Sequence, residues 1–214
     1  MNYNVFKLIP ILLFSGMMIS CNNDDDSSEQ MVETEFFPLS VGNYWVYKMY
    51  ETPNPETDEL LFASIIDTVK IKGTTLVDDI QYFVKETKRY NSNILEEEST
   101  ELIRVNESGH LVAEGGKVLH PGNDIAYTVS QEWMDFVLEY KLEQEFTWNF
   151  EGSTFAVMPY VGKPQNEDIV NHPYLEGKKV IYGYQEGIGE VYMSCPAVFG
   201  TYLYEMRLVD FHLN

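Results

Sequence analysis

The sequence predicts a mainly β fold, built as a single antiparallel, strongly curved sheet or half-barrel with at most one or two short helices. Hydrophobic and polar residues alternate at a period of two along most of the chain after residue 35, which is typical of strands. Aromatic residues make up 14% of the sequence, and they favour strands over helices. Glycine-containing turns separate the alternating runs, as in proteins built from hairpins.

The first half of the predicted domain contains one strand and then a long hairpin. Trp45, Tyr47 and Met49 share one face of the first strand. A turn is expected at residues 73–75, and a polar loop is expected at residues 91–99. The strands expected in this half, each marked by the same alternation, are residues 44–49, 60–72, 80–90, 101–106 and 111–114.

Residues 131–145 fit two periods at once. Four residues have the helical spacing i, i+3, i+4 and i+7, namely Trp133, Phe136, Val137 and Tyr140. Four residues also alternate at a period of two, namely Phe136, Leu138, Tyr140 and Leu142. We expect a short helix here, with a strand as the alternative.

The C-terminal part returns to a strand pattern, interrupted by a loop at residues 162–177 that contains two prolines. In the last strand the apolar residues change from one face to the other at Leu208 and Val209, which predicts a β-bulge. The strands expected in this part are residues 146–161, 178–184, 190–195 and the segment from 202 onward.

Residues 1–20 are predicted to be a signal peptide. Lys7 provides a positive charge, and residues 8–19 form an almost unbroken apolar run of 12 residues. A membrane-spanning helix needs about 20 apolar residues, whereas the apolar region of a signal peptide has about 7–15. The run therefore has the length of a signal peptide.

Cys21 stands where this apolar run ends. Residues 18–21 (Met-Ile-Ser-Cys) resemble the lipobox of bacterial lipoproteins, although Met18 departs from the usual leucine. The resemblance implies cleavage before Cys21, a diacylglycerol on its thiol and acylation of the new amine, and hence a lipid bilayer as a partner. The alternative is an ordinary secretory peptide with a coincidental cysteine.

Residues 21–34 are predicted to be a lipidated, disordered acidic tether, and residues 35–214 to be the β-rich globular domain. The tether is too polar to bury the surface that would offset its ordering entropy. Acidic residues directly after the cysteine also resemble the export signal of surface lipoproteins in Bacteroidetes-type bacteria. We therefore expect a protein anchored in the outer membrane and exposed at the cell surface, with the periplasmic face as the alternative.

Three further segments carry a family resemblance. Residues 37–47 (FPLSVGNYWVY) resemble the opening motif of uncharacterised Bacteroidetes-type outer-membrane and surface lipoproteins, and residues 67–88 and 186–191 are similar to that group as well. The resemblance implies a β-rich fold and a location in the cell envelope. It implies no activity, because the family has none assigned.

Charge and cysteine content exclude several classes of function. The formal net charge is −20, which repels phosphate backbones, so nucleic acid is not expected as a partner. If Cys21 is acylated, Cys195 has no partner for an intramolecular disulfide, because the chain has 2 cysteines. We expect Cys195 to be a small buried residue in a strand.

No motif for catalysis, metal binding or a cofactor is present. The four histidines lack the spacing of a metal site, and we expect them at the surface: His110, His120, His172 and His212. The acidic runs at residues 24–26, 96–98 and 167–168 are interpreted as solvated charge, because none has the spacing of a calcium loop.

Aromatic residues are the most suggestive binding feature of the sequence. They could line a concave sheet and stack against a ligand, or they could be ordinary core residues. The eight candidates are Trp45, Tyr47, Trp133, Trp148, Tyr182, Tyr184, Tyr202 and Tyr204.

Three functions remain open at this point. A non-enzymatic binding module for a glycan, a lipid or a protein partner predicts a concave face with aromatic residues. A structural or accessory subunit of an envelope complex predicts an exposed apolar patch. A hydrolase of extracellular polymers predicts a cleft with clustered carboxylates of perturbed pKa.

Overall fold

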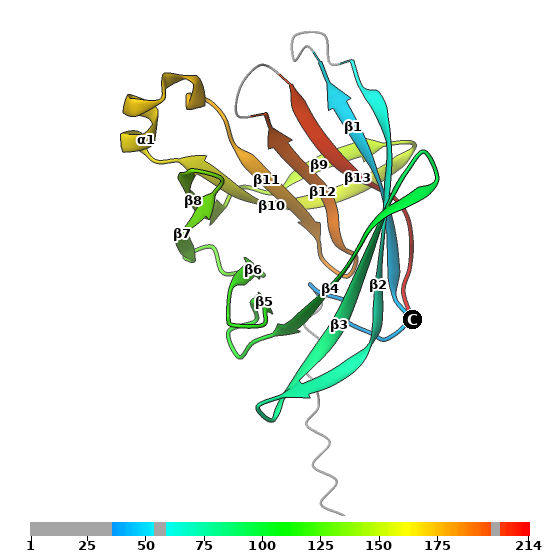
Figure 1. Cartoon of the computed structure of the whole chain (residues 1–214). Coiled ribbons are helices and arrows are strands. Elements are labelled where there is room, and N and C mark those ends of the chain that lie inside the picture. The colour runs from blue at the N-terminus through cyan, green and yellow to red at the C-terminus, as the bar shows by residue number, and fades with distance from the viewer. Residues whose placement is uncertain (1–35, 54–58, 198–201) are drawn as a thin grey trace, which may run out of the picture. The chain divides into compact units, whose positions relative to one another are not determined.

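Thirteen strands and one helical segment make up the described part of the chain, residues 36–53, 59–197 and 202–214, in a computed structural model (Figure 1). The predicted signal peptide, the tether and Cys21 lie outside the described residues. The strands are β1 (Tyr44–Thr52), β2 (Leu61–Val77), β3 (Ile80–Asn91), β4 (Ile94–Val105), β5 (Leu111–Ala113), β6 (Val118–His120), β7 (Thr128–Trp133), β8 (Phe136–Leu142), β9 (Phe146–Phe150), β10 (Ser153–Pro164), β11 (Val180–Gln185), β12 (Gly189–Pro196) and β13 (Leu203–His212).

All strand pairs are antiparallel, which confirms the predicted fold class. The order across the sheet is β6-β5-β4-β3-β2-β1-β13-β12-β11-β10-β8-β7, and β9 pairs with β10 off this path. The short helix α1 (Asn166–Asn171) and a 3-10 turn (Pro173–Leu175) interrupt the predicted loop at residues 162–177. None of the described helices is long and apolar enough to cross a bilayer.

The prediction of a turn at residues 73–75 is wrong, because β2 continues to Val77. The turn lies instead at Asp78 and Asp79, whose φ angles are 51° and 61°. Two consecutive residues with positive φ form the type I′ turn that matches the twist of a hairpin, and aspartate tolerates that conformation. Gly73 lies at a shift in the pairing register and leaves the hairpin intact.

The prediction of a loop at residues 91–99 is also wrong. Ser92 and Asn93, with φ angles of 49° and 67°, form another two-residue turn, and β4 begins at Ile94. The glutamates of β4 are tolerated in a strand because β3 presents cations opposite them. Lys88 Nζ, for example, lies 3.5 Å from Glu98 Oε1.

The short helix expected within residues 131–145 is absent. This stretch is the β7–β8 hairpin, with its turn at Met134, whose φ is 54°. In β8 the buried residues alternate with accessible ones: Phe136, Leu138, Tyr140 and Leu142 face the core. The period of two therefore outweighed the helical spacing, because the strand buries four side chains on one face.

The predicted β-bulge near Leu208 is confirmed. In the pairing of β1 with β13, Val46 lies opposite Asp210 and Tyr47 lies opposite Leu208, so Val209 is the extra residue. The bulge keeps Leu208 in the core. Cys195 in β12 is a free thiol that is partly buried beside the second core cluster, and burial raises its pKa.

The hairpin of β9 and β10 carries an aromatic box around one cation. The Arg207 guanidinium carbon lies 4.7 Å from the centre of the Phe150 ring, 5.4 Å from that of Trp148 and 5.5 Å from that of Tyr50. Arg207 Nε donates to Glu205 Oε2 over 2.8 Å. Since Phe150 and Trp148 belong to β9 and Arg207 belongs to β13, these cation–ring contacts join the hairpin to β13 of the main sheet.

Candidate functional site

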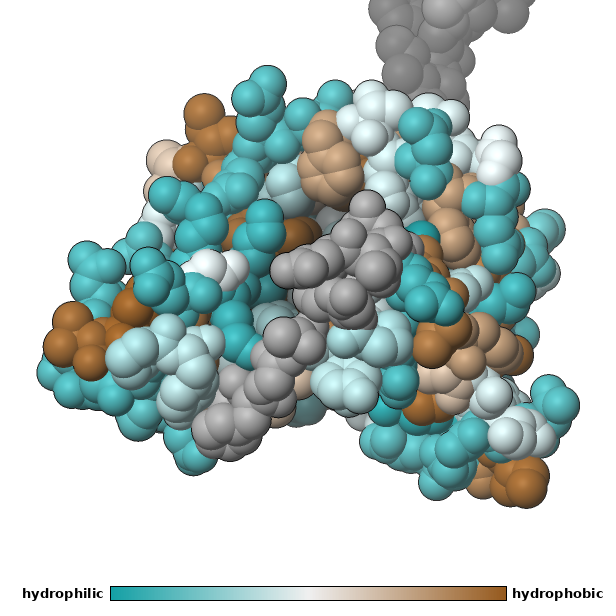
Figure 2. Space-filling view, turned by 90° about the horizontal axis from the view of Figure 1, so that it is seen from above, coloured by the Kyte–Doolittle hydropathy of each residue, from teal (hydrophilic) through white to brown (hydrophobic). Residues whose placement is uncertain are grey.

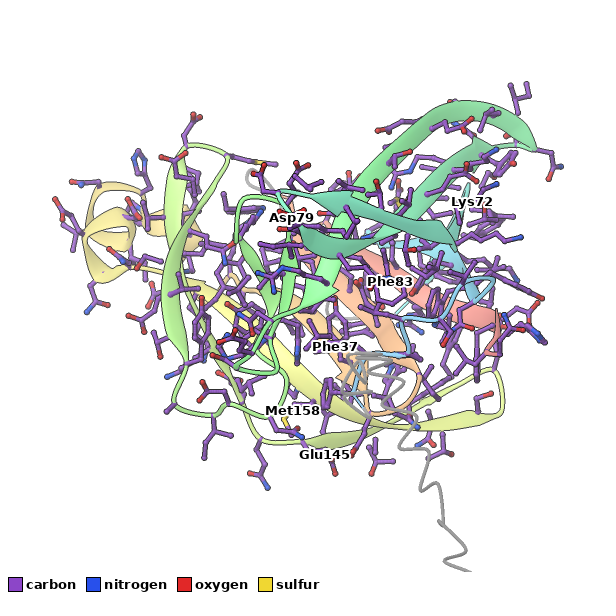
Figure 3. The ribbon with its side chains drawn as sticks, turned by 90° about the horizontal axis from the view of Figure 1, so that it is seen from below. Phe37, Lys72, Asp79, Phe83, Glu145 and Met158 are labelled. Atoms are coloured by element: carbon purple, nitrogen blue, oxygen red, sulfur yellow. The ribbon has the colours of Figure 1, made fainter. Side chains whose placement is uncertain are left out.

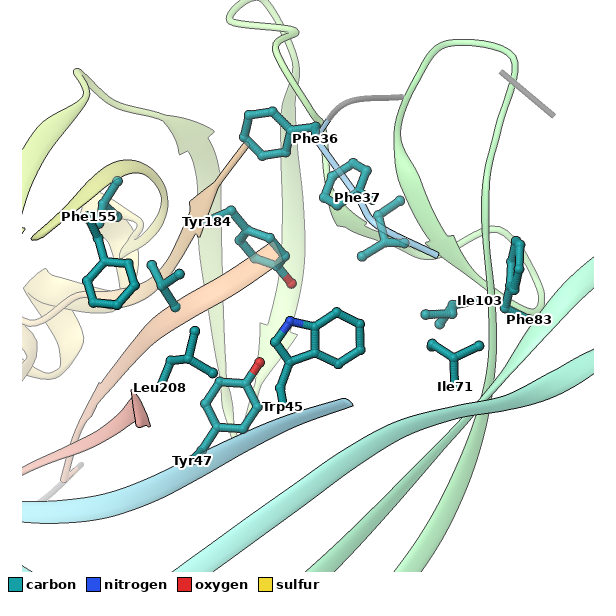
Figure 4. Packing of buried hydrophobic residues seen from close by; sticks show 13 residues of the cluster. Phe36, Phe37, Trp45, Tyr47, Ile71, Phe83, Ile103, Phe155, Tyr184 and Leu208 are labelled. Carbon is teal, nitrogen blue, oxygen red and sulfur yellow. The ribbon is translucent and has the colours of Figure 1, made fainter. Parts of the chain in front are cut away.

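The polar ends of three aromatic residues converge on one interior point. Alternation along β1 places Trp45 and Tyr47 on the same face, and Tyr184 reaches toward them from β11 (Figure 4). Trp45 Nε1 donates to the Ile188 carbonyl over 2.7 Å, and the Tyr47 hydroxyl donates to the Glu190 carbonyl over 2.9 Å. These bonds tie β1 to the turn that leads into β12.

The turn itself depends on Gly189. Its φ of 95° lies in the region that favours glycine, and it lets the chain reverse immediately before Glu190. A Cβ at this position would lie 3.8 Å from Trp45 Nε1 and Pro38 Cδ, an ordinary van der Waals contact, so the φ angle and not space demands glycine. The local sequence therefore fixes where the Glu190 side chain starts.

A cavity of about 180 Å³ lies beside this point. Strands β1 to β6 and β11 to β13 contribute to it, together with the segment of Phe37 that precedes β1. Seen from below, Phe37 lies near the middle of the view, whereas Lys72 lies toward one side (Figure 3). Its apolar wall includes Leu39, Val69, Ile71, Ile103, Leu119 and Met206.

Three charged side chains line the cavity, and two of them are already paired. Asp67 accepts two bonds from Arg89, of 2.8 Å to Oδ1 and 2.7 Å to Oδ2. Lys85 Nζ donates to Glu101 Oε2 over 2.7 Å. The third is Glu190, whose Oε2 accepts a 3.2 Å bond from the Tyr184 hydroxyl.

Burial governs the ionisation of this polar end. It raises the pKa of Glu190 above its ordinary value, and the nearby Lys85 opposes that shift without cancelling it. Burial, reinforced by the negative charge of Glu190, also holds the pKa of Tyr47 and of Tyr184 well above the ordinary value. The two hydroxyls therefore stay protonated and act as hydrogen-bond donors.

His120 lies beside the cavity, in an aromatic cluster. Its ring is 4.2 Å from that of Tyr184 and 5.1 Å from that of Phe36, centre to centre. Its Nδ1 accepts a 3.1 Å bond from the Gly122 backbone N–H. Burial lowers the pKa of His120 to about 3, so the ring is neutral at physiological pH.

The prediction that the histidines lie at the surface is wrong for His110 and His120, which are buried. Their neighbourhood is rich in turns, but the short strands β5 and β6 turn both rings inward. His110 Nε2 lies 3.2 Å from Asp124 Oδ2, and its ring packs edge-on against Tyr127. His172 is partly accessible, and His212 is exposed.

The structure brings three of the eight predicted aromatic residues together at the cavity, namely Trp45, Tyr47 and Tyr184. The other five lie elsewhere. Trp148 packs against Arg207, whereas Trp133 and Tyr182 pack against the second core cluster. Tyr204 is partly buried in β13, and Tyr202 is 47% exposed. Sequence reasoning missed Asp67, Lys85 and Glu190. No signal distinguished them, because the chain has 34 acidic residues.

Among the described residues, no group of three or more histidine, cysteine, aspartate or glutamate side chains is placed to hold a metal ion. The cavity offers an apolar wall and a small number of hydrogen-bonding groups. Asp67 has both oxygens occupied by Arg89, so the cavity presents one carboxylate, Glu190, that no cation neutralises.

The sequence matches no protein-family model and no curated protein. A solved structure of a proposed exported protein with a YmcC-like fold, from Bacteroides fragilis NCTC 9343, is 11% identical, with a TM-score of 0.49 over 83% of this chain and 98% of that chain. A proposed lipoprotein from Parabacteroides distasonis ATCC 8503 is 10% identical, with a TM-score of 0.45 and the same coverage. At these values we infer nothing about function from either protein.

Proposed function

We propose that the protein is a lipid-anchored binding protein of the bacterial cell envelope, and that its ligand is a small amphipathic molecule held in the interior cavity. One observation carries the proposal: an apolar cavity of about 180 Å³ ends in a few polar groups that the fold holds in fixed positions. Small-molecule sites combine these properties, since the polar groups fix the orientation of a ligand whose surface is mostly apolar.

The volume of the cavity limits the ligand. A cavity of about 150 Å³ with an aliphatic and aromatic wall binds benzene. Sites for drug-sized ligands measure roughly 300–1,000 Å³. The cavity therefore suits a group slightly larger than a benzene ring, and this favours a compact apolar group over an extended glycan or a long acyl chain.

Neither alternative function has an observation of equal weight. A hydrolase of polymers would use two carboxylates as acid and base, and the cavity presents Glu190 alone because Arg89 occupies both oxygens of Asp67. An accessory subunit would present a continuous apolar patch, and on the face shown in Figure 2 the apolar residues lie in separate patches among hydrophilic ones.

Binding of 2-phenylethanol tests the proposal. The full chain carrying Cys21→Ser is titrated calorimetrically, so that no acyl chain competes for the cavity. We expect saturable one-to-one binding, because the phenyl ring fits the cavity and the hydroxyl reaches its polar end. Val69→Phe is expected to abolish binding, since Val69 lines the cavity and the larger side chain fills it.

Val46→Phe is the matched control. Val46 lies between Trp45 and Tyr47 in β1, so it points to the opposite face of the sheet. This variant should bind 2-phenylethanol as the parent chain does. Absence of binding by the parent, or equal loss in both variants, would contradict a ligand site in this cavity.

The anchoring part of the proposal rests on Cys21. The lipobox-like residues 18–21 and the acidic stretch after them support acylation, attachment to the outer membrane and exposure at the cell surface. Once Cys21 is acylated, Cys195 has no cysteine with which to form an intramolecular disulfide, because the chain has 2 cysteines.

Cys21→Ser should move the protein from the membrane fraction to the soluble fraction, because a triacylated cysteine supplies the anchor. Fractionation followed by immunoblotting measures this, with Cys195→Ser as the control that should stay membrane-bound. A Cys21→Ser protein that still sediments with membranes would contradict the proposal that Cys21 is acylated. Protease added to intact cells distinguishes the surface, where the domain is digested, from the periplasmic face, where it is protected.

A further inference from the structure

The charges around the cavity do not balance. Asp67 is paired with Arg89, and Lys85 is paired with Glu101, so these four side chains contribute two neutral pairs. In the described part of the chain, no lysine, arginine or histidine nitrogen lies within 4.0 Å of the Glu190 carboxylate. Glu190 is thus the acidic group of the cavity that has no salt-bridge partner, and the nearby Lys85 is paired with Glu101.

The fold also holds Glu190 in place. Its carbonyl accepts the Tyr47 hydroxyl, its Oε2 accepts the Tyr184 hydroxyl, and the preceding turn accepts the Trp45 indole N–H. The two donors from β1 hold the backbone of residues 188 and 190, and the Tyr184 hydroxyl of β11 holds the carboxylate itself, so the carboxylate cannot swing out of the cavity without breaking that bond. A fixed carboxylate at the end of an apolar wall is arranged to receive a hydrogen-bond donor.

We infer that the cavity selects ligands in which a protonated amine lies next to a compact apolar group. This deepens the proposed function and rests on it. The ammonium would supply the counterion that Glu190 lacks, through a charge-assisted hydrogen bond that is roughly twice as strong as a neutral one. A ligand carboxylate would instead place a second negative charge beside Glu190, and like charges at this distance repel.

The volume of the cavity sets the size of such a ligand. Glu190 and the apolar wall of Val69, Ile71 and Met206 line the same cavity of about 180 Å³. A linker of two carbons between a ring and an amine fits within that volume. Arylethylamines are therefore the class of ligand that fits the cavity best.

Three probes with a shared phenyl group and different polar ends test the inference: 2-phenylethylamine, 2-phenylethanol and 3-phenylpropanoate. Each is titrated calorimetrically at pH 7 into the full chain carrying Cys21→Ser. We expect the amine to bind about tenfold more tightly than the alcohol, and the carboxylate to bind more weakly than the alcohol. Equal or tighter binding of the alcohol or the carboxylate overturns the inference.

Glu190→Gln removes the charge and keeps the size and the acceptor for Tyr184. It should reduce the affinity for the amine to that for the alcohol, while binding of the alcohol stays unchanged and shows that the cavity is intact. Glu132→Gln is the matched control, because Glu132 is exposed in the edge strand β7. Lys85→Met is a second variant, which removes the opposing cation and should tighten binding of the amine.

The dependence on pH provides an independent readout. The titratable groups around Glu190 are Tyr47, Asp67, Lys85, Glu101, Tyr182 and Tyr184. Because the pKa of Glu190 is raised, binding of the amine should strengthen as pH increases through that pKa, and the Glu190→Gln variant should lose this dependence.

The outcomes separate the two proposals. If none of the three probes binds, the ligand site itself is refuted. If the alcohol binds in a manner sensitive to Val69→Phe but the amine binds no better, the ligand site stands and the selection by Glu190 is refuted. Amine affinity that is unchanged in both Glu190→Gln and Lys85→Met refutes the selection in the same way.

Discussion

Arg207→Met is expected to destabilise the protein by about 3–5 kcal/mol, because removing one partner of a buried ion pair leaves the other charge uncompensated. The side chains of Arg207 and Glu205 are 12% and 9% exposed. Methionine fills the space between the rings of Trp148 and Phe150, so the loss reflects charge rather than volume. Urea unfolding followed by tryptophan fluorescence measures the change.

Two further variants identify the cause. Glu205→Gln keeps the acceptor for the Tyr192 hydroxyl and removes the uncompensated negative charge. The double variant with Arg207→Met should therefore regain a large part of the free energy of unfolding that Arg207→Met loses. Lys163→Met breaks a pair with Glu143 whose side chains are 50% and 31% exposed, and it should cost less than about 1 kcal/mol. An Arg207→Met protein as stable as the parent would show that the aromatic box does not depend on its cation.

The stability of the protein should fall as pH decreases from 6.5 toward 3, because of His120. Burial lowers the pKa of His120 to about 3, while the unfolded chain titrates near 6.5. Between these values the unfolded state binds the additional proton, so acid favours unfolding. The expected slope is up to about 1.4 kcal/mol per pH unit, measured from urea unfolding curves at pH 7, 6 and 5.

Comparison with a variant isolates this contribution. His120→Leu should flatten the slope, whereas His212→Leu, at an exposed position, should leave it unchanged. Glu190 acts in the opposite direction, because its raised pKa makes the folded state bind the proton as pH falls. That contribution is common to all three proteins and cancels in the difference. An unchanged slope in His120→Leu would contradict a neutral, buried His120.

The strands were predictable where alternation was strict and the turn chemistry was conventional. The β13 bulge is an example, since the alternation of apolar residues changes from one face of the strand to the other at Leu208 and Val209. The hairpin turns were harder, because Asp78-Asp79 and Ser92-Asn93 contain no glycine. Their positive φ angles arise from the pairing of the flanking strands, and a local pattern does not contain that information.

The candidate site was only partly predictable, for a similar reason. Trp45 and Tyr47 were identified by their residue type and shared face, but each has its hydrogen-bond partner, Ile188 and Glu190 respectively, 143 positions away in the chain. Which acid lacks a counterion depends on cross-strand pairs such as Lys85 with Glu101, and these follow from register. The buried state of His120 likewise depends on rings supplied by Phe36 and Tyr184.

The pairing of β1 with β13 has a consequence for the order of folding. β13 is the last described strand, and it completes the edge of β1 that β2 leaves open. Asn214 adds a 2.8 Å bond from its backbone N–H to Asn43 Oδ1, across 171 positions. Contacts between such distant positions form slowly, because the intervening chain loses entropy before they do. The cavity, whose wall includes Met206 of β13, is therefore complete only after the last described strand has paired with β1.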